Sequence, residues 1–105
     1  MNNDLLNEYA TKDLYFAAFL HVKGMSIKKL EKYSGGKSPV YFIFGDKKKC
    51  ELLESMFWNG TGEEVMVNVK DFTTAVRDLR ARAFSVSRVI GRAENEYVGG
   101  DNENN

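Results

Sequence analysis

The chain has 105 residues, which suits one domain with a modest core and is too short for two. Hydrophobic residues make up 43% and charged residues 29%, a balance typical of folded and not of disordered proteins. The formal net charge is zero, yet residues 12–92 carry all 15 Lys and Arg against nine acids, a local charge of +6. A basic body with acidic ends hints at a nucleic-acid partner and equally fits an ordinary domain with a solubilising tail.

The sequence starts without a basic-then-apolar leader, and the single Cys50 has no partner for an internal disulfide. Both features fit a reducing compartment, so we expect a cytoplasmic protein that has no membrane segment. The composition divides the chain into three parts. We expect a flexible N-terminus over residues 1–10, one domain over residues 11–92 and an acidic, disordered tail over residues 93–105.

Residues 11–24 form the most apolar stretch and are predicted to be a helix. Their large apolar side chains cannot share one face at 100° per residue, so we expect the helix to be enclosed on most sides. Thr11 suits the N-cap, Asp13 falls in the first turn, and Gly24 suits the C-terminal stop. We expect His21, which lies within this stretch, to be a hydrogen-bonded core residue.

Two strands are predicted to follow as a hairpin. Residues 25–33 are interpreted as a strand because a turn cluster at 34–39 and a strongly β-forming run at 40–44 come next. Both faces of the second strand are apolar, so we expect it to be central or covered on two sides. A short third strand is predicted at residues 65–67.

Two further helices complete the prediction. Asp46 is expected to cap a helix over residues 47–58, and the turn residues 59–62, which include Gly60, are expected to end it. Its inward face holds Cys50, Leu53 and Phe57 with Leu52 and Met56 beside them. The last helix is predicted over residues 69–92 from one apolar face with alternate steps of four and three residues: Phe72, Val76, Leu79, Ala83, Val86 and Ile90. The predicted fold class is therefore α+β: a small antiparallel sheet packed on three helices, in the order α-β-β-α-β-α.

Three groups of cations favour a polyanion partner, and we expect them to converge on one continuous surface in the folded chain. The run 47–49 opens a helix, where positive charge opposes the macrodipole unless phosphate binds there. Lysines also mark the hairpin, including Lys32 and Lys37, and arginines lie opposite the apolar face of the last helix. Solvated lysines, and arginines paired with acids such as Asp78, would explain the same pattern. The predicted nucleic-acid contacts are Lys28, Lys29, Lys47, Lys48, Lys49, Arg77, Arg80, Arg88 and Arg92, with Phe84 and Tyr41 as stacking candidates.

Catalysis is not predicted. Cys50 and His21 would suit an enzyme only if the thiol were exposed with a low pKa, and one His with one Cys makes a poor zinc site. We therefore expect no enzyme activity, metal or cofactor. The alternative to nucleic-acid binding is a protein-interaction module, which would be either a homodimer or an adaptor or inhibitor of a host or phage protein. Its basis is an aromatic excess that so small a core cannot hold, made up of Tyr33, Tyr41, Trp58 and Phe84.

The chain is similar to a small uncharacterised domain family of bacteria and phages. The resemblance covers residues 11–85 and rests on the motifs T-K-D-L-Y-F-A-A-F-L, V-Y-F-I-F, F-W-N-G and V-K-D-F-T-T-A-V-R-D-L-R. That family implies no particular activity.

The predicted element order also resembles one half of a LAGLIDADG homing endonuclease, with residues 16–24 over the signature helix. The resemblance implies that Ala17 and Ala18 allow the close helix approach by which that family dimerises. Lys23 stands where the metal-binding acid should be, and a strand is missing before the last helix. The resemblance therefore implies a DNA-binding relic and not a nuclease.

Overall fold

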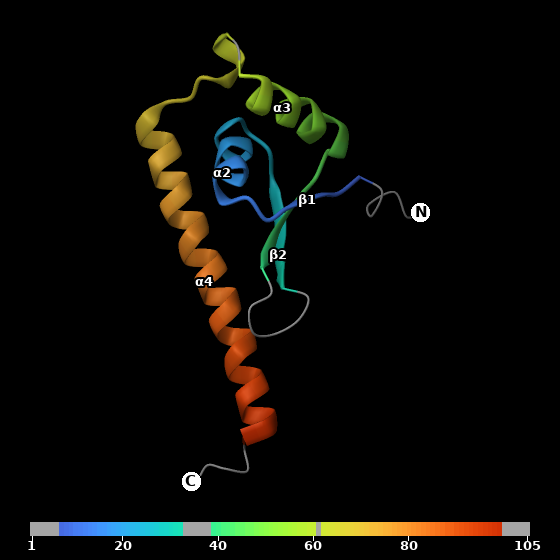
Figure 1. Cartoon of the computed structure of the whole chain (residues 1–105), viewed down its shortest axis with the longest axis vertical. Helices are drawn as coiled ribbons and strands as arrows, with labels where there is room; N and C mark the ends of the chain where they lie inside the picture. The colour runs from blue at the N-terminus through green and yellow to red at the C-terminus, as the bar shows by residue number, and fades with distance from the viewer. Residues whose placement is uncertain (1–6, 33–38, 61, 100–105) are drawn as a thin grey trace.

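The computed structural model describes residues 7–32, 39–60 and 62–99, and their side chains except those of Glu64 and residues 89–99. Three helices and a three-stranded antiparallel sheet confirm the predicted α+β class (Figure 1). In chain order, the elements are β1 (Tyr9–Thr11), α2 (Leu14–Val22), β2 (Ile27–Lys32), β3 (Val40–Phe44), α3 (Lys47–Asn59), a short 3-10 helix η1 (Glu63–Val65) and α4 (Val69–Gly99).

The sheet has the order β1-β3-β2, so β3 is the central strand, as its two apolar faces predict. Phe42 and Phe44 are buried in the core, while Ile43, which alternates to the other face, is also only 3% exposed. The β2–β3 register shifts between Ile27 and Lys29, which leaves Lys28 at a bulge.

The third strand comes from a different part of the chain than the sequence predicts. Residues 65–67 form the end of η1 and an irregular segment, and not a strand. Both edges of β3 are already occupied, by β2 and by β1, so that run has no edge of β3 left to pair with. Tyr9 and Ala10, predicted to be flexible, belong to β1 instead. Burial holds Tyr9 in place, with its ring 6.0 Å from that of Phe16, centroid to centroid.

Helix α2 is the enclosed element that its composition predicts. Five consecutive residues, Phe16 to Leu20, are buried. The cap is Asp13 and not Thr11, because the Asp13 carboxylate accepts a hydrogen bond from Phe16 N at 3.0 Å. Gly24 ends the helix with a φ of 96°, as predicted. His21, by contrast, is exposed, so its prediction as a core residue is wrong.

Helix α3 follows its prediction closely. Asp46 caps it, Gly60 ends it, and Cys50 and Leu53 are buried on its inner face. Leu52 differs from the prediction, since it is 57% exposed. At 100° per residue Leu52 lies outside the narrow stripe that Cys50 and Leu53 define.

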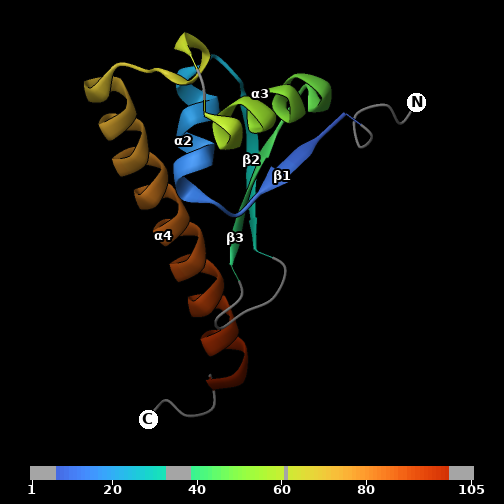
Figure 2. The ribbon, with the colours of Figure 1, turned by 45° about the horizontal axis from the view of Figure 1, so that its top comes forward.

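Helix α4 packs against α2 and along β2. Leu79 of the predicted face is buried, and Phe72, Val76 and Ala83 of the same face pack against the core. Ala75, which was not part of the prediction, is buried as well. The helix continues past Arg92 to Gly99, so the start of the predicted disordered tail is helical. Figure 2 shows this part of α4 running beyond the sheet. Residues 100–105, the rest of the predicted tail, lie outside the described residues.

Candidate nucleic-acid interface

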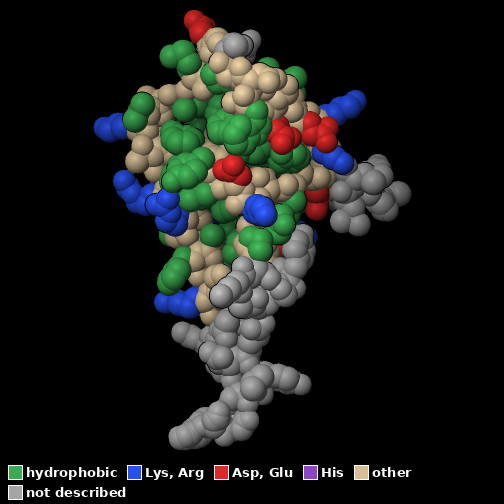
Figure 3. Space-filling view, viewed as in Figure 1, with side chains coloured by type: hydrophobic (Ala, Val, Ile, Leu, Met, Phe, Trp, Pro, Cys, Tyr) green, Lys and Arg blue, Asp and Glu red, His purple; other side chains and the backbone are tan. Residues whose placement is uncertain are grey.

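The predicted cations do not form one continuous surface. α3 begins at its end farther from α4, so Lys47 to Lys49 lie across the molecule from the arginines of α4 (Figures 1 and 2). Figure 3 shows Lys and Arg side chains mainly at the two opposite edges of the face in view, with an apolar region between them. The cations therefore make two separate groups.

The start of α3 has little free hydrogen-bonding capacity for phosphate. The Asp46 carboxylate accepts a hydrogen bond from Lys49 N at 3.2 Å, and Asn7 accepts one from Lys47 N through its backbone oxygen at 3.1 Å. A phosphate at this helix end would have to displace both acceptors. The lysine side chains are exposed, but the backbone amides of Lys47 and Lys49 already have acceptors within the fold.

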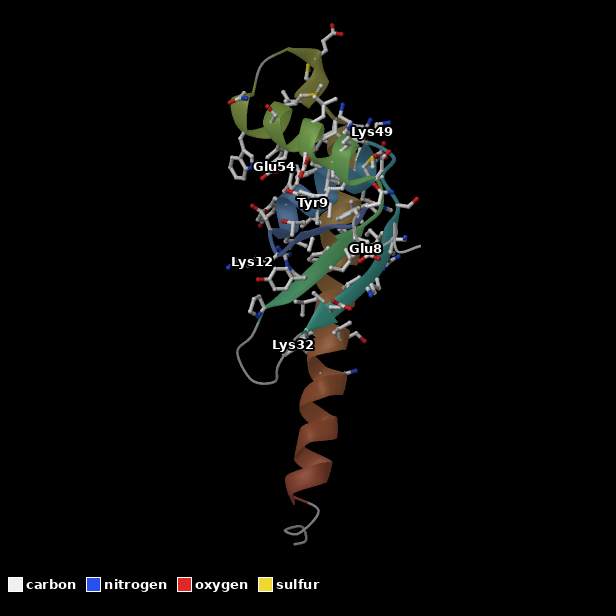
Figure 4. The ribbon with its side chains drawn as sticks, turned by 90° about the vertical axis from the view of Figure 1, so that its right-hand side faces the viewer. Glu8, Tyr9, Lys12, Lys32, Lys49 and Glu54 are labelled. Atoms are coloured by element: carbon white, nitrogen blue, oxygen red, sulfur yellow. The ribbon has the colours of Figure 1, made fainter. Side chains whose placement is uncertain are left out.

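Two of the hairpin lysines, Lys29 and Lys32, have interaction partners, and Lys28 is exposed. Lys29 forms an ion pair with Glu31, with 3.1 Å between Nζ and Oε2. Lys28 lays its side chain over Gly45, next to the start of α3. Lys32, on β2, is labelled in Figure 4. Lys37 and Tyr33 lie outside the described residues.

The arginines of α4 form the more open group. Arg77, Arg80 and Arg88 are exposed, and Phe84, which is 65% exposed, lies among them. Helical spacing places these four within about 80° of arc on the helix surface. Among the described residues none forms an ion pair with these arginines, so Asp78 does not neutralise them. The side chain of the fourth predicted arginine, Arg92, lies outside the described residues.

Two contacts organise this group. The guanidinium carbon of Arg88 lies 5.6 Å from the ring centroid of Phe84, a cation–π contact. Arg80 Nη2 donates a hydrogen bond to the Tyr15 hydroxyl at 3.4 Å, which joins α4 to α2. We call the surface made by Arg77, Arg80, Phe84, Arg88, Tyr15 and Lys12 the arginine surface.

Lys12 and Tyr15 were not predicted as site residues. Lys12, Arg80 and Phe84 line one hollow on the surface of the protein. In Figure 4 the Lys12 side chain lies on the opposite side of the molecule from Lys49. Local sequence gave no signal for either residue, because their place depends on how α2 packs on α4. Arg82, by contrast, lines a different hollow with His21, on the other flank of α4. Tyr41, the second stacking candidate, is half-buried in β3.

Cys50 does not meet the condition for a nucleophile. Its side chain is fully buried and donates to the Gly45 backbone oxygen at 3.5 Å. Burial, and then the negative charges of Asp46 and Glu51, raise the pKa of the thiol to about 11. The unreactive neutral thiol therefore predominates at neutral pH.

Tyr9 is the other residue whose titration the fold changes. Burial raises the pKa of its hydroxyl, and so does the hydrogen bond that it donates to the Glu54 carboxylate (Figure 4). This contact joins β1 to α3. It anchors the edge strand and lies away from the arginine surface.

The two alanines assigned to a dimer contact by the homing-endonuclease resemblance are not accessible. Ala17 and Ala18 are 0% exposed within the single chain, in the core that also holds Ala75 of α4. The close helix approach that they permit is therefore intramolecular. Lys23, at the expected acid position, donates from Nζ to the Met66 backbone oxygen at 3.2 Å.

Within the described part of the chain, no three His, Cys, Asp or Glu side chains are placed to hold a metal ion. None of the described helices is both long and apolar enough to cross a membrane.

Fold and site together define a small α+β domain with two separate cationic surfaces. Residues 6–85 match the domain of unknown function DUF5659, and the chain belongs to that family. The comparison with curated proteins and the comparison with solved structures gave no match.

Proposed function

We propose that this chain is a non-catalytic nucleic-acid-binding domain that holds phosphates on the arginine surface. The observation that carries the proposal is a row of exposed arginines, interleaved with Phe84, that have no ion-pair partner among the described residues. Guanidinium groups match phosphate oxygens in a two-point geometry, and an exposed ring beside them offers a stacking platform.

The size of the surface suits contacts with several phosphates. Arg77 and Arg88 are separated by about 16 Å along the helix axis, from the rise per residue of an α-helix. Lys12, from the segment before α2, adds a cation beside Arg80 across the hollow. Such a surface gives binding that is sensitive to salt and tolerant of sequence, because its contacts are to the backbone of the nucleic acid.

The test compares two variants with the same change in charge. One replaces Arg77, Arg80 and Arg88 with alanine, and the other replaces Lys47, Lys48 and Lys49. Binding of labelled oligonucleotides is followed by fluorescence anisotropy over a salt series. We expect the arginine variant to lose most affinity, with a salt slope lower by about 0.7–0.9 per phosphate contact removed. The lysine variant should bind like the unaltered protein.

Two outcomes would overturn the proposal. The first is a lack of binding by the unaltered protein at low salt and micromolar concentration. The second is an equal loss of affinity in both variants, which would indicate a general effect of net charge. The cytoplasmic location and the bacterial or phage setting stay predictions from the sequence.

A second candidate function is protein interaction. Its specific observation is a set of large apolar side chains that are more than half exposed on α3, on the segment leading into α4 and at the first residue of α4: Leu52, Trp58, Met66 and Val69. Figure 3 shows apolar side chains gathered over α2 and α3. Light scattering over a concentration series would detect a homodimer. The substitution Trp58→Ser should weaken this self-association. A constant monomer mass at high concentration would reject self-association.

A further inference from the structure

A hollow of about 390 Å³ opens on the arginine surface, between α4, the start of β3 and the segment leading into α2. This volume lies near the lower end of the range for small-molecule sites, about 300–1,000 Å³. The residues that define its chemistry are Lys12, Leu14, Pro39, Phe42, Arg80 and Phe84.

The walls of the hollow are largely apolar. Phe42 is only 2% exposed and forms a firm wall, Leu14 is half-buried, and Phe84 is 65% exposed. A flat ring entering the hollow would bury apolar surface against these side chains and could stack on Phe84. The arrangement favours a ligand with a planar, weakly polar part.

The charge on the hollow is entirely positive among the described residues that line it. Lys12 and Arg80 contribute cations, and none of the lining side chains is a carboxylate. Arg80 is also held by its hydrogen bond to Tyr15, which reduces the entropy that it would lose on binding. The site therefore combines a flat apolar wall with two donors for an anion.

We propose that the hollow takes one unpaired nucleotide of a single strand, its base on Phe84 and its phosphate on Lys12 and Arg80. The inference rests on the proposed function and narrows it to single strands. In a duplex the base faces are stacked against their neighbours and are not free to enter such a hollow. In a single strand each base offers a free face, which an exposed aromatic ring can cover.

The experiment measures the affinity of a thymidine 12-mer and of a duplex of equal length for four proteins. These are the unaltered chain, Phe84→Leu, Lys12→Gln and a control, Trp58→Leu, which alters an exposed aromatic residue on α3. Phe84→Leu keeps an apolar side chain but removes the stacking ring. Because Phe84 is exposed, the substitution should leave the fold intact, which circular dichroism would check.

We expect Phe84→Leu to weaken single-strand binding at least about five-fold, from the usual contribution of one stacked base. Lys12→Gln should weaken it as well, while the control should not change it. The duplex should bind more weakly than the single strand and be insensitive to Phe84→Leu. Thymidine monophosphate should bind far more weakly than the 12-mer, because one nucleotide lacks the other phosphate contacts.

The failures are distinguishable. If Phe84→Leu affects both nucleic acids equally, or neither, while the arginine variant loses binding, the hollow is not a nucleotide site and the proposed function stands. Equal affinity for the monophosphate and the 12-mer also overturns the inference, because it indicates a site for free nucleotides. If the unaltered chain binds neither nucleic acid, the proposed function itself fails.

Discussion

Arg80 Nη2 lies 3.4 Å from the hydroxyl oxygen of Tyr15, and this hydrogen bond joins α4 to α2 through two residues that are 65 positions apart in sequence. Tyr15 is 52% exposed although it lies in the most buried helix of the fold. The contact fixes one cation of the arginine surface at the edge of the hollow.

Tyr15→Phe should therefore lower nucleic-acid affinity without unfolding the protein. The ring remains but the acceptor for Arg80 is lost, so the arginine is less ordered before binding. An ordering cost of about 0.5–1.5 kcal/mol corresponds to a loss of about two-fold to ten-fold in affinity. Fluorescence anisotropy with a single-stranded oligonucleotide would measure it.

A double-mutant comparison gives the control for this prediction. In an Arg80→Ala background, Tyr15→Phe should have no further effect, because the group that it orients is absent. An undiminished effect in that background would mean that Tyr15 contacts the ligand directly.

Asp46 has an unusual backbone conformation for a residue that caps a helix. Its φ of 58° is in the left-handed region, and its carboxylate accepts a hydrogen bond from Lys49 N. Asp46→Ala would remove the cap and leave an alanine in that region, so we expect a loss of about 2–3 kcal/mol in the free energy of unfolding. Urea unfolding would measure this loss.

Two other substitutions at this position separate the causes. Asp46→Asn keeps the side-chain acceptor and tolerates the left-handed region, so it should be close to the unaltered protein. Asp46→Gly removes the backbone strain but provides no side-chain cap, so its free energy of unfolding should lie between those of the Asn and Ala variants. Equal stability of the Ala and Asn variants would contradict this account of the cap.

The sequence predicted the elements whose signals are local. The apolar run of α2, the β-forming run of β3 and the turn residues Asp46 and Gly60 each specify their structure within a few neighbours. The sequence did not predict β1, because three residues, of which one is aromatic, are too few to show a hydrophobic period. These residues form a strand because they pair with an edge of β3, and that edge exists only in the folded sheet.

The candidate site was predicted only within a single helix. The period of α4 is enough to place Arg77, Arg80 and Phe84 on one side. The relation of α4 to the start of α3 depends on the path of the chain, which local patterns do not give. That is why the lysines at 47–49 were expected beside the arginines and lie across the molecule from them (Figure 1).

The buried thiol of Cys50 predicts a specific dependence of stability on pH. The fold raises its pKa from an ordinary 9.0 to about 11, so the folded state holds the proton more tightly than the unfolded state. The resulting stabilisation is complete below pH 9 and is lost as the pH rises through about 11. The free energy of unfolding should fall over this interval.

Cys50→Ala isolates this contribution, because other groups titrate at alkaline pH as well. The difference in unfolding free energy between the unaltered protein and this variant should narrow between pH 9 and 11. At pH 8 a thiol reagent should label Cys50 slowly until urea unfolds the protein. Rapid labelling of the folded protein would show that the side chain is accessible.

The edge strand β1 gives the last prediction, since it covers one side of the central strand. Tyr9 and Thr11 pair with Phe44 and Phe42, so a chain beginning at Lys12 would leave that edge of β3 open. An exposed apolar edge pairs readily with other molecules, and Tyr9 would no longer pack on Phe16. We expect a lower melting temperature and aggregation, measured by circular dichroism and light scattering. A chain beginning at Asn7 keeps β1 and its pairing, and should match the full chain. If the shorter chain melted at the same temperature and stayed monomeric, β1 would contribute nothing to the protection of the sheet.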